Sequence, residues 1–336
     1  MKLIVEFDSM DACNKGISGS DLNVLFKSSL LPYVLLNASK KSDLDGLNGV
    51  INISKPDEGH YLDGEYLSTV AFTPAVHKRL LANRGLVGWG DTKVVIIDSG
   101  VNEAEVTVVD TKDFTGTGIR DFIGHGTRVS KIVKHFARGA NLYVAKVGNN
   151  PPMGDNVLMA LEWAAEVGAD LVNISIGFEC KPNKERCLLC RLLNKISSMG
   201  IIVVVAAGND GEKGEGFIAC PGCAEKAITV GAIDENENLA YYSSKGTPGQ
   251  NKPNILAPGA VYIDGALDSG TSFSAPIITG ILASSISKTN SNDVIKKLYQ
   301  TAKDLGLPRH HQGNGLLNLD QFVTEVCDEK INSGTQ

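Results

Sequence analysis

The sequence predicts an α/β fold, a mostly parallel sheet with helices on both faces, preceded by a small α+β unit. Two observations support this prediction. From about residue 92 onward, apolar runs of strand length alternate with helical segments, and the runs are nearly continuous in Val, Ile, Leu and Ala. Such strands are buried on both faces, as in a parallel sheet between two layers of helices. The first 65 or so residues instead alternate short strands and short helices.

We expect residues 1–66 to form a separate unit and residues 67–336 to form the main domain. In the first unit, antiparallel strands with helices on one face suit the order of the segments. These segments are a strand at 2–7, a helix at 21–30, a strand at 32–39, a helix at 42–47 and a strand at 49–54. Residues 55–66 are rich in Pro, Gly, Asp, Glu and Tyr and are interpreted as a linker.

The main domain supplies the strands and helices of the large sheet. Its strands are predicted at residues 93–98, 141–147, 170–176, 201–207 and 227–232. Helices are predicted at 155–167, with Asp155 as the N-cap, and at 188–199. Ligands of such sheets bind beyond the carboxyl ends of the strands. Asp98 and Asn209 follow two strands at such ends, so the sheet should bring them to one edge.

Separate stretches of the chain hold the side chains that one hydrolytic mechanism requires. They are VVIIDSG at 94–100, GHGT at 124–127, VVVAAGND at 203–210 and GTSFSAP at 270–276. A serine hydroxyl is a weak nucleophile, and it needs a base, a group that orients the base and a donor for the oxyanion. Asp98, His125, Ser272 and Asn209 provide these parts, and the order Asp, His, Ser is one of the known chain orders. The residues therefore predict a serine peptidase.

Each stretch taken alone has another interpretation. Asp98 in Asp-Ser-Gly is compatible with an ordinary turn, and Ser272 is compatible with a helix N-cap. A lone His125 is more often structural, although glycines on both sides leave it accessible. On an alternating α/β scaffold, the four stretches together favour catalysis.

Between about residues 85 and 320 the chain resembles the subtilisin-like serine peptidases, the subtilases. IIDSG, HGT, AAGN and GTSFSAP resemble the aspartate, histidine, oxyanion-asparagine and nucleophile motifs of that family. NISIG at 173–177 resembles the segment that pairs with the substrate backbone. The resemblance implies a subtilisin-like fold and serine endopeptidase activity.

The resemblance implies a role for each catalytic residue. Ser272 attacks the scissile carbonyl, and His125 takes the serine proton and returns it to the leaving amine. Asp98 orients the His125 ring and stabilises its charged form. The side-chain amide of Asn209 and the backbone N–H of Ser272 bind the oxyanion.

The resemblance also implies a substrate cleft. Ser175, Ile176 and Gly177 would form a strand edge along which an extended peptide pairs. The pocket for the side chain before the cleaved bond would be lined by Ala206, Ala207, Gly208 and Ala219. We hypothesise that Asp210, at the rim of this pocket, attracts a basic side chain of the substrate. Phe178 is expected to crowd or extend the substrate cleft.

The first unit resembles, in pattern and position, the propeptide of that family, which assists folding and inhibits the enzyme. The expected partners are therefore a peptide or protein substrate and the chain's own N-terminal unit acting in cis. We expect the linker to thread the active site and to be cut by the enzyme itself within residues 61–69. Two alternatives stay open: a catalytically inactive binding or regulatory protein with this fold, and a dedicated maturation protease or peptide cyclase.

No cofactor is expected for the chemistry. Thirteen residues separate HGT from the next predicted strand, so the calcium-binding loop that many subtilases carry there is expected to be missing. Five of the seven cysteines cluster as two C-x-x-C pairs, Cys187 with Cys190 and Cys220 with Cys223, together with Cys180. Thiolates from two such pairs bind structural zinc. A disulfide and ordinary buried thiols are the other interpretations, and Cys180 is a substitute ligand.

Composition argues against several other classes. The net charge of -6, with acids and bases mixed along the chain, indicates no nucleic-acid-binding surface. The longest apolar run, at 201–207, is too short to span a membrane. The first residues lack the basic and apolar regions of a secretory signal, so a cytoplasmic location is expected.

Overall fold

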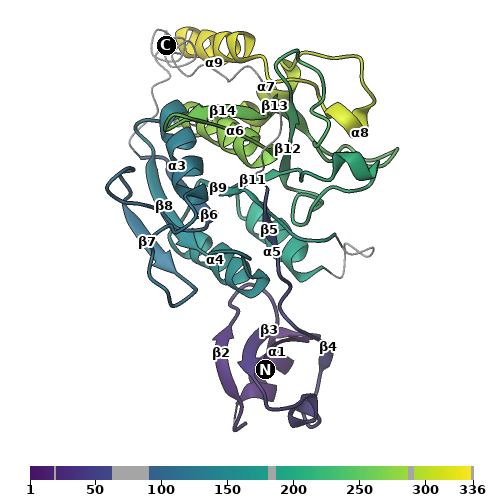
Figure 1. Ribbon diagram of the computed structural model, residues 1–336. Helices are drawn as coiled ribbons and strands as arrows, with labels where there is room; N and C mark the ends of the chain where they lie inside the picture. Colours follow the sequence, from purple (N-terminus) through teal and green to yellow (C-terminus); the bar gives the residue numbers. More distant parts are fainter. Residues whose placement is uncertain (19, 63–90, 181–186, 287–290, 334–336) are drawn as a thin grey trace.

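The computed structural model describes residues 1–18, 20–62, 91–180, 187–286 and 291–333 (Figure 1). The predicted boundary at residues 66 and 67 lies outside the described residues, as does the part of the predicted cleavage segment from 63 to 69. Within the described ranges, no helix is both long enough and apolar enough to cross a membrane.

The core of the main domain is a seven-stranded sheet in which all neighbouring strands are parallel. In spatial order the strands are β13 (Ile255–Pro258), β12 (Ile228–Ile233), β11 (Ile202–Ala206), β9 (Leu171–Ile174), β6 (Lys93–Asp98), β8 (Asn141–Lys146) and β7 (Asp110–Asp113). This architecture confirms the predicted fold class. The predicted strand at 170–176 is divided at Ser175 into β9 and a short edge strand, β10 (Ile176–Gly177).

Two layers of helices cover the two faces of the sheet. They are α3 (His125–Phe136), α6 (Thr271–Ser285), α4 (Gly154–Glu166) and α5 (Leu188–Ser198). Val94 and Ile96 of β6 pack in one buried cluster with residues of α3 and α6. Val95 and Ile97 point the other way and pack with residues of α4 and α5. Every residue of α6 is buried, which agrees with a sequence that contains no charged residue.

Shorter elements complete the main domain. They are β5 (His60–Tyr61), η3 (Gly211–Lys213), β14 (Ala260–Ile263), β15 (Ala266–Ser269), α7 (Ser291–Gln300), α8 (Arg309–Gln312) and α9 (Leu319–Ser333). β14 and β15 form an antiparallel hairpin that packs against α6. β5 belongs to the linker in sequence, yet it pairs with β10 of the main domain.

The first unit is a four-stranded antiparallel sheet in the order β2-β3-β1-β4. Its elements are β1 (Lys2–Phe7), α1 (Met10–Ile17), β2 (Asn23–Lys27), β3 (Tyr33–Asn37), η1 (Lys41–Leu44) and β4 (Val50–Ser54). Its own core includes Leu3, Val5 and Cys13. In Figure 1 the unit (purple) lies at the bottom, next to α4, and β5 leads from it into the main domain.

Polar contacts hold the first unit on α4. Glu162 accepts hydrogen bonds from the Tyr33 hydroxyl at 3.1 Å and from Ser29 N at 2.9 Å. Lys2 and Asp155 form an ion pair at 2.5 Å. The prediction that Asp155 caps α4 is wrong, because the helix begins at Gly154 and the N-cap is Met153. The Asp155 carboxylate instead pairs with Lys2 and so joins α4 to the first unit.

The predicted helix at 21–30 is also wrong. The residues of β2 alternate between exposed and half-buried side chains and pair with β3, as a strand at the edge of a sheet does. The helix of this unit is α1, whose N-cap Ser9 accepts a hydrogen bond from Ala12 N at 3.1 Å. Its apolar pattern is weak because Cys13 is its one fully buried residue.

Candidate active site

Asp98 and His125 are held side by side by neighbouring elements. Asp98 is the last residue of β6, and His125 is the first residue of α3. His125 Nδ1 lies 2.6 Å from Asp98 Oδ1, and both side chains are buried. Burial raises the pKa of the Asp98 carboxyl, while His125 and the Ser99 N–H oppose that increase. Only glycine fits at position 126, because a Cβ on Gly126 would lie 2.3 Å from the Gly100 carbonyl oxygen.

Asp121 fixes the loop that leads into α3, and the sequence motifs did not single it out. Its Oδ1 accepts hydrogen bonds from Ser99 Oγ at 2.9 Å and from Gly124 N at 2.8 Å. Its Oδ2 accepts from Thr127 N at 2.8 Å and from Thr127 Oγ1 at 2.7 Å. Asp121 therefore ties the end of β6 to the first turn of α3. Its sequence signal is its position three residues before Gly124, in DFIGHGT.

Ser272 lies in the first turn of α6, where Gly270 is the N-cap, so the interpretation of Ser272 as a helix cap is wrong. Ser272 Oγ donates to the carbonyl oxygen of Ser175 at 2.9 Å, and Ser175 Oγ donates to the carbonyl oxygen of Ser272 at 2.8 Å. The ring of the next residue, Phe273, has its centroid 5.9 Å from that of the His125 ring. The fold thus brings the three separate sequence stretches to one place.

Asn209 follows β11, and Thr271 orients its side-chain amide. Asn209 Oδ1 accepts hydrogen bonds from Thr271 N at 3.1 Å and from Thr271 Oγ1 at 2.9 Å. Asn209 Nδ2 is buried and has no hydrogen-bond partner among the described residues. A buried donor without a partner destabilises the fold by about 1–3 kcal/mol, so its presence indicates a site that a ligand completes.

The last described residue of the linker, Leu62, lies at this site. Ser272 N donates a hydrogen bond to the carbonyl oxygen of Leu62 at 3.1 Å. Leu62 N donates to the carbonyl oxygen of Ser175 at 3.4 Å. The main chain of Leu62 is therefore bound on both sides by residues that the sequence predicts for the active site.

The residues before Leu62 run along the predicted substrate-binding edge as an extended strand. β5 pairs antiparallel with β10, with Tyr61 opposite Ile176 and His60 opposite Gly177. All three residues predicted for this edge, 175 to 177, therefore pair with the N-terminal segment. The arrangement is that of a peptide added to the edge of a sheet.

The sequence pattern of the family described as the subtilase family matches residues 90–315, more than half of the chain. This chain belongs to the subtilase family. Curated relatives include subtilisin DY of Bacillus licheniformis, 32% identical over 255 residues that cover 68% of this chain and 90% of the relative. Subtilisin Savinase of Lederbergia lenta is 32% identical over 270 residues, which cover 74% of this chain and 94% of the relative. As a member of the family, this subtilase is a serine endopeptidase.

Solved structures agree in fold with this subtilase. The epidermin leader peptide processing serine protease of Staphylococcus aureus superposes with a TM-score of 0.76 and 21% identity, covering 100% of this chain and 99% of that chain. A lanthipeptide protease superposes with a TM-score of 0.66 and 22% identity, covering 76% of this chain and 95% of that chain. Both superpositions show a shared fold.

In this subtilase the Leu62 side chain fills a pocket whose walls are small residues. Leu62 is fully buried and packs in one cluster with Ala206 and Ala219. A Cβ on Gly177 would lie 2.8 Å from Leu62 Cδ2. A Cβ on Gly208 would lie 3.0 Å from the Ala219 Cβ. Gly177 therefore leaves room for the leucine side chain, and Gly208 leaves room for the wall residue Ala219.

The structure does not place the side chains of Ala207 and Asp210, which were also predicted for the pocket, against Leu62. The Ala207 side chain packs on the other face of the sheet, while its carbonyl oxygen accepts a hydrogen bond from Ala219 N at 2.8 Å. Asp210 forms an ion pair with Lys213 at 2.8 Å, and its charge acts on His60 of β5. These contacts give no support to the hypothesis that Asp210 selects a basic side chain.

Tyr61 covers the histidine of the subtilase site. The centroids of the Tyr61 and His125 rings are 4.9 Å apart. The Tyr61 hydroxyl donates to the carbonyl oxygen of Gly148 at 2.8 Å, which fixes the ring. The side chain that precedes Leu62 therefore shields the Asp98–His125 pair from water.

The predicted thiolate group lies next to the Leu62 pocket. Cys220 follows Ala219 directly, and its N–H and carbonyl pair with those of Phe178, each at 2.9 Å. Cys187 is the N-cap of α5, and Cys190 lies in the first turn of that helix. Their sulfur atoms lie 3.4 Å and 3.6 Å from Cys220 Sγ.

Proposed function

We propose that Ser272, His125, Asp98 and Asn209 are the catalytic residues of this serine endopeptidase. Ser272 attacks the carbonyl carbon of the scissile bond while His125 accepts its proton at Nε2. The Asp98 carboxylate, 2.6 Å from His125 Nδ1, holds the tautomer whose Nε2 accepts the proton, and it stabilises the imidazolium that forms. The Ser272 hydroxyl donates to the carbonyl oxygen of Ser175 in the present arrangement. The hydroxyl must therefore rotate until its proton points to His125 Nε2 before Ser272 attacks.

The proposed oxyanion donors are Ser272 N and Asn209 Nδ2. The support for Asn209 is its buried Nδ2, whose orientation Thr271 fixes from the other end of the amide. A donor that is fixed before the reaction strengthens its hydrogen bond as negative charge develops on the substrate oxygen. Removing one such donor raises the barrier by roughly 3–4 kcal/mol.

We propose further that the chain is made as a precursor and cuts itself between Leu62 and Asp63. The observation that carries this proposal is the hydrogen bond from Ser272 N to the Leu62 carbonyl oxygen at 3.1 Å. Ser272 N is one of the two proposed oxyanion donors, and Leu62 falls within the predicted segment 61–69. Asn209 Nδ2, the other proposed donor, makes no hydrogen bond to the Leu62 carbonyl oxygen in the described residues. After cleavage, the first unit keeps its contacts with α4 and occupies the cleft as a product.

The proposed substrates carry an apolar side chain before the cleaved bond. Leu62 is fully buried and packs in one apolar cluster with Ala206 and Ala219. The residue before it is Tyr61, whose ring packs on His125. A peptide ending in Tyr-Leu on the acyl side therefore fits the cleft best.

Labelling with a fluorophosphonate tests the assignment of the catalytic serine. The probe reacts only with a serine that its surroundings activate, so we expect labelling of the processed wild type and none of Ser272→Ala. A folded wild-type chain that stays unlabelled after its cleft has been emptied would favour the alternative, an inactive binding or regulatory protein.

A second candidate function is a dedicated processing protease. The likeness to the epidermin leader peptide processing protease and the lanthipeptide protease favours it. The cleft also favours it, because a Cβ on Gly59 would lie 2.6 Å from the Phe178 ring. This candidate predicts that Gly-His-Tyr-Leu peptides are cut much faster than their Val-His-Tyr-Leu counterparts, and that casein is cut at few bonds. Equal rates for both peptides would argue for a general endopeptidase.

A further inference from the structure

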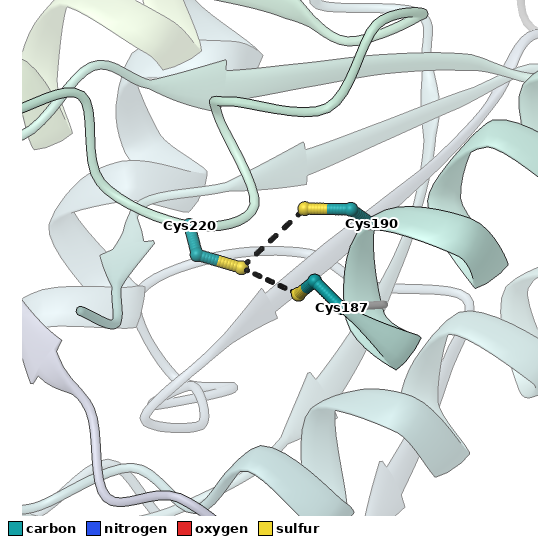
Figure 2. Close-up of side chains that lie close together, drawn as sticks. All are labelled: Cys187, Cys190 and Cys220. Carbon is teal, nitrogen blue, oxygen red and sulfur yellow. Dashed lines mark hydrogen bonds between the residues drawn. The ribbon is translucent and has the colours of Figure 1, made fainter. Parts of the chain in front are cut away.

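Four cysteines outside the catalytic group lie close together between α5 and the loop that follows η3. Figure 2 shows the sulfur atoms of Cys187, Cys190 and Cys220 pointing toward one another. Cys220 Sγ lies 3.4 Å from Cys187 Sγ and 3.6 Å from Cys190 Sγ. Cys223 Sγ lies 3.6 Å from Cys190 Sγ on the other side. All but Cys187, which is half-buried, are buried.

These separations are compatible with ligands of one metal ion. A tetrahedral zinc ion with Zn–S bonds of about 2.3 Å holds its sulfur ligands about 3.8 Å apart. The three sulfurs of Cys187, Cys190 and Cys220 lie within 4.8 Å of one another, which is the reach of one ion. A disulfide between two of these three would need sulfurs at about 2.05 Å.

We propose that Cys187, Cys190, Cys220 and Cys223 bind one zinc ion through their thiolates. Each C-x-x-C pair then provides two ligands, the first from the start of α5 and the second from the loop before β12. Cys180 Sγ lies 2.6 Å from Cys223 Sγ, which is closer than two ligands of one zinc ion lie, at about 3.8 Å. The two sulfurs therefore compete for the fourth position, and Cys180 is the alternative donor. The ion has no role in the peptide-bond chemistry proposed for Ser272.

The surroundings favour the negative charge of a thiolate site. Cys187 and Cys190 lie at the N-terminus of α5, where the free N–H groups stabilise anions. A cavity of about 700 Å³ reaches the cluster and is lined by Cys187 and Cys220, which gives an ion a path from solvent. Arg191 also lines this cavity, but its guanidinium forms an ion pair with Glu6 of the first unit.

The position of the cluster connects it to the substrate cleft. Cys220 pairs through its backbone with Phe178, the residue after β10, and follows Ala219 of the Leu62 pocket. A metal ion at Cys220 would therefore tie α5 to both the strand edge and the pocket wall. If the proposed function holds, removal of the ion should raise KM for a Tyr-Leu peptide several-fold and change kcat little, because the catalytic residues do not touch the cluster.

Metal analysis of the full chain, purified without chelator, tests the proposal. We expect about one zinc ion per chain in the wild type and in the matched control Cys13→Ala, whose thiol lies in the core of the first unit. Cys187→Ser and Cys220→Ser should lose the ion to a chelator concentration that leaves the wild type loaded. This readout does not depend on activity, so it stands even if the proposed catalytic function fails.

Cobalt substitution keeps the test decisive if a serine variant does not fold. Wild-type chain reloaded with Co²⁺ should show the thiolate-to-cobalt absorption and the visible bands of tetrahedral coordination. Cys180→Ser should keep both spectra and zinc, and Cys223→Ser should lose them. The reverse result contradicts the choice of Cys223. Chain that holds no metal, or a disulfide found by alkylation and mass analysis, contradicts the site itself, and chain loaded with iron contradicts the choice of zinc.

Discussion

The backbone N–H of Ser272 donates a hydrogen bond to the carbonyl oxygen of Leu62 at 3.1 Å. This bond joins the first turn of α6 to a residue that lies 210 positions earlier in the sequence. It fixes the position of the N-terminal segment in the cleft. The Leu62 side chain then lies in the pocket of small residues, and the Tyr61 ring packs on His125. The N-terminal segment thus lies where the acyl part of a substrate is expected.

Replacement of Asn209 tests the oxyanion donor. We expect Asn209→Ala to lower kcat on a Tyr-Leu peptide by about 10²–10³, with little change in KM, because the donor acts on the transition state. The exposed Asn236→Ala is the matched control and should behave as the wild type. A loss confined to KM would contradict the role given to Nδ2.

Replacement of Leu62 tests the pocket in the intact precursor. Leu62→Asp and Leu62→Lys should slow self-cleavage by about 100-fold or more, since either would bury an unpaired charge among small apolar residues. Leu62→Met is the control of similar volume and should be cut at a rate near that of the wild type. Fast cleavage of Leu62→Lys would instead revive the hypothesis that Asp210 selects basic residues. Mass analysis over time measures all three.

Replacement of Gly177 should change which side chains the pocket accepts. A Cβ at this position would lie 2.8 Å from Leu62 Cδ2, so Gly177→Ala narrows the pocket. We expect kcat/KM for a Tyr-Leu peptide to fall at least about tenfold relative to a Tyr-Ala peptide, an effect of about 1.4 kcal/mol. An unchanged ratio of the two peptides would show that Gly177 does not border the pocket.

His60 should make binding of the N-terminal segment pH-dependent. Desolvation in β5 lowers the pKa of His60 from 6.5; the Lys213 charge adds to the decrease and the Asp210 charge opposes it. The released segment therefore takes up a proton at a higher pH than the bound segment does. Binding is strongest above the ordinary pKa of 6.5 and weakens as the pH falls toward the lowered value, by at most about tenfold per pH unit.

The quantity to measure is the inhibition of the processed enzyme by its own first unit. A short reporter peptide follows the activity at about pH 5.5 and about pH 7.5, on either side of the ordinary histidine pKa of about 6.5. The wild type should be inhibited less at the lower pH. His60→Gln removes the titrating group while leaving the catalytic residues in place, so its inhibition should change less between the two values. The same pH dependence in both chains would assign the effect to other groups.

Five of the seven strands of the main sheet could be predicted from the sequence because they are buried on both faces. The partly exposed β7 and the four-residue β13 were not predicted. β6 is found at the predicted residues, and α4 and α5 lie within one residue of prediction. The pattern of apolar residues does not identify the type of element where its side chains are only partly buried. The strand β2 and the helix α1 each present few fully buried side chains, so local periodicity did not separate them.

The residues proposed to be catalytic could be found from motifs, but their supporting contacts could not. Asp121 forms side-chain hydrogen bonds to Ser99 and Thr127, and such tertiary contacts are not visible in a local sequence pattern. The position of Leu62 depends on the register of β5 with β10, and register is a tertiary property. The linker sequence predicted that a cut would fall near these residues, whereas the paired strand points to one bond.

The most direct test of the central claim is the intact mass of purified wild-type and Ser272→Ala chains followed over time, with N-terminal sequencing of any fragment. The account predicts that the wild type alone separates into two pieces and that the larger begins at Asp63. A larger piece that begins at another residue, or a wild-type chain that stays whole while a fluorophosphonate labels Ser272, would contradict it.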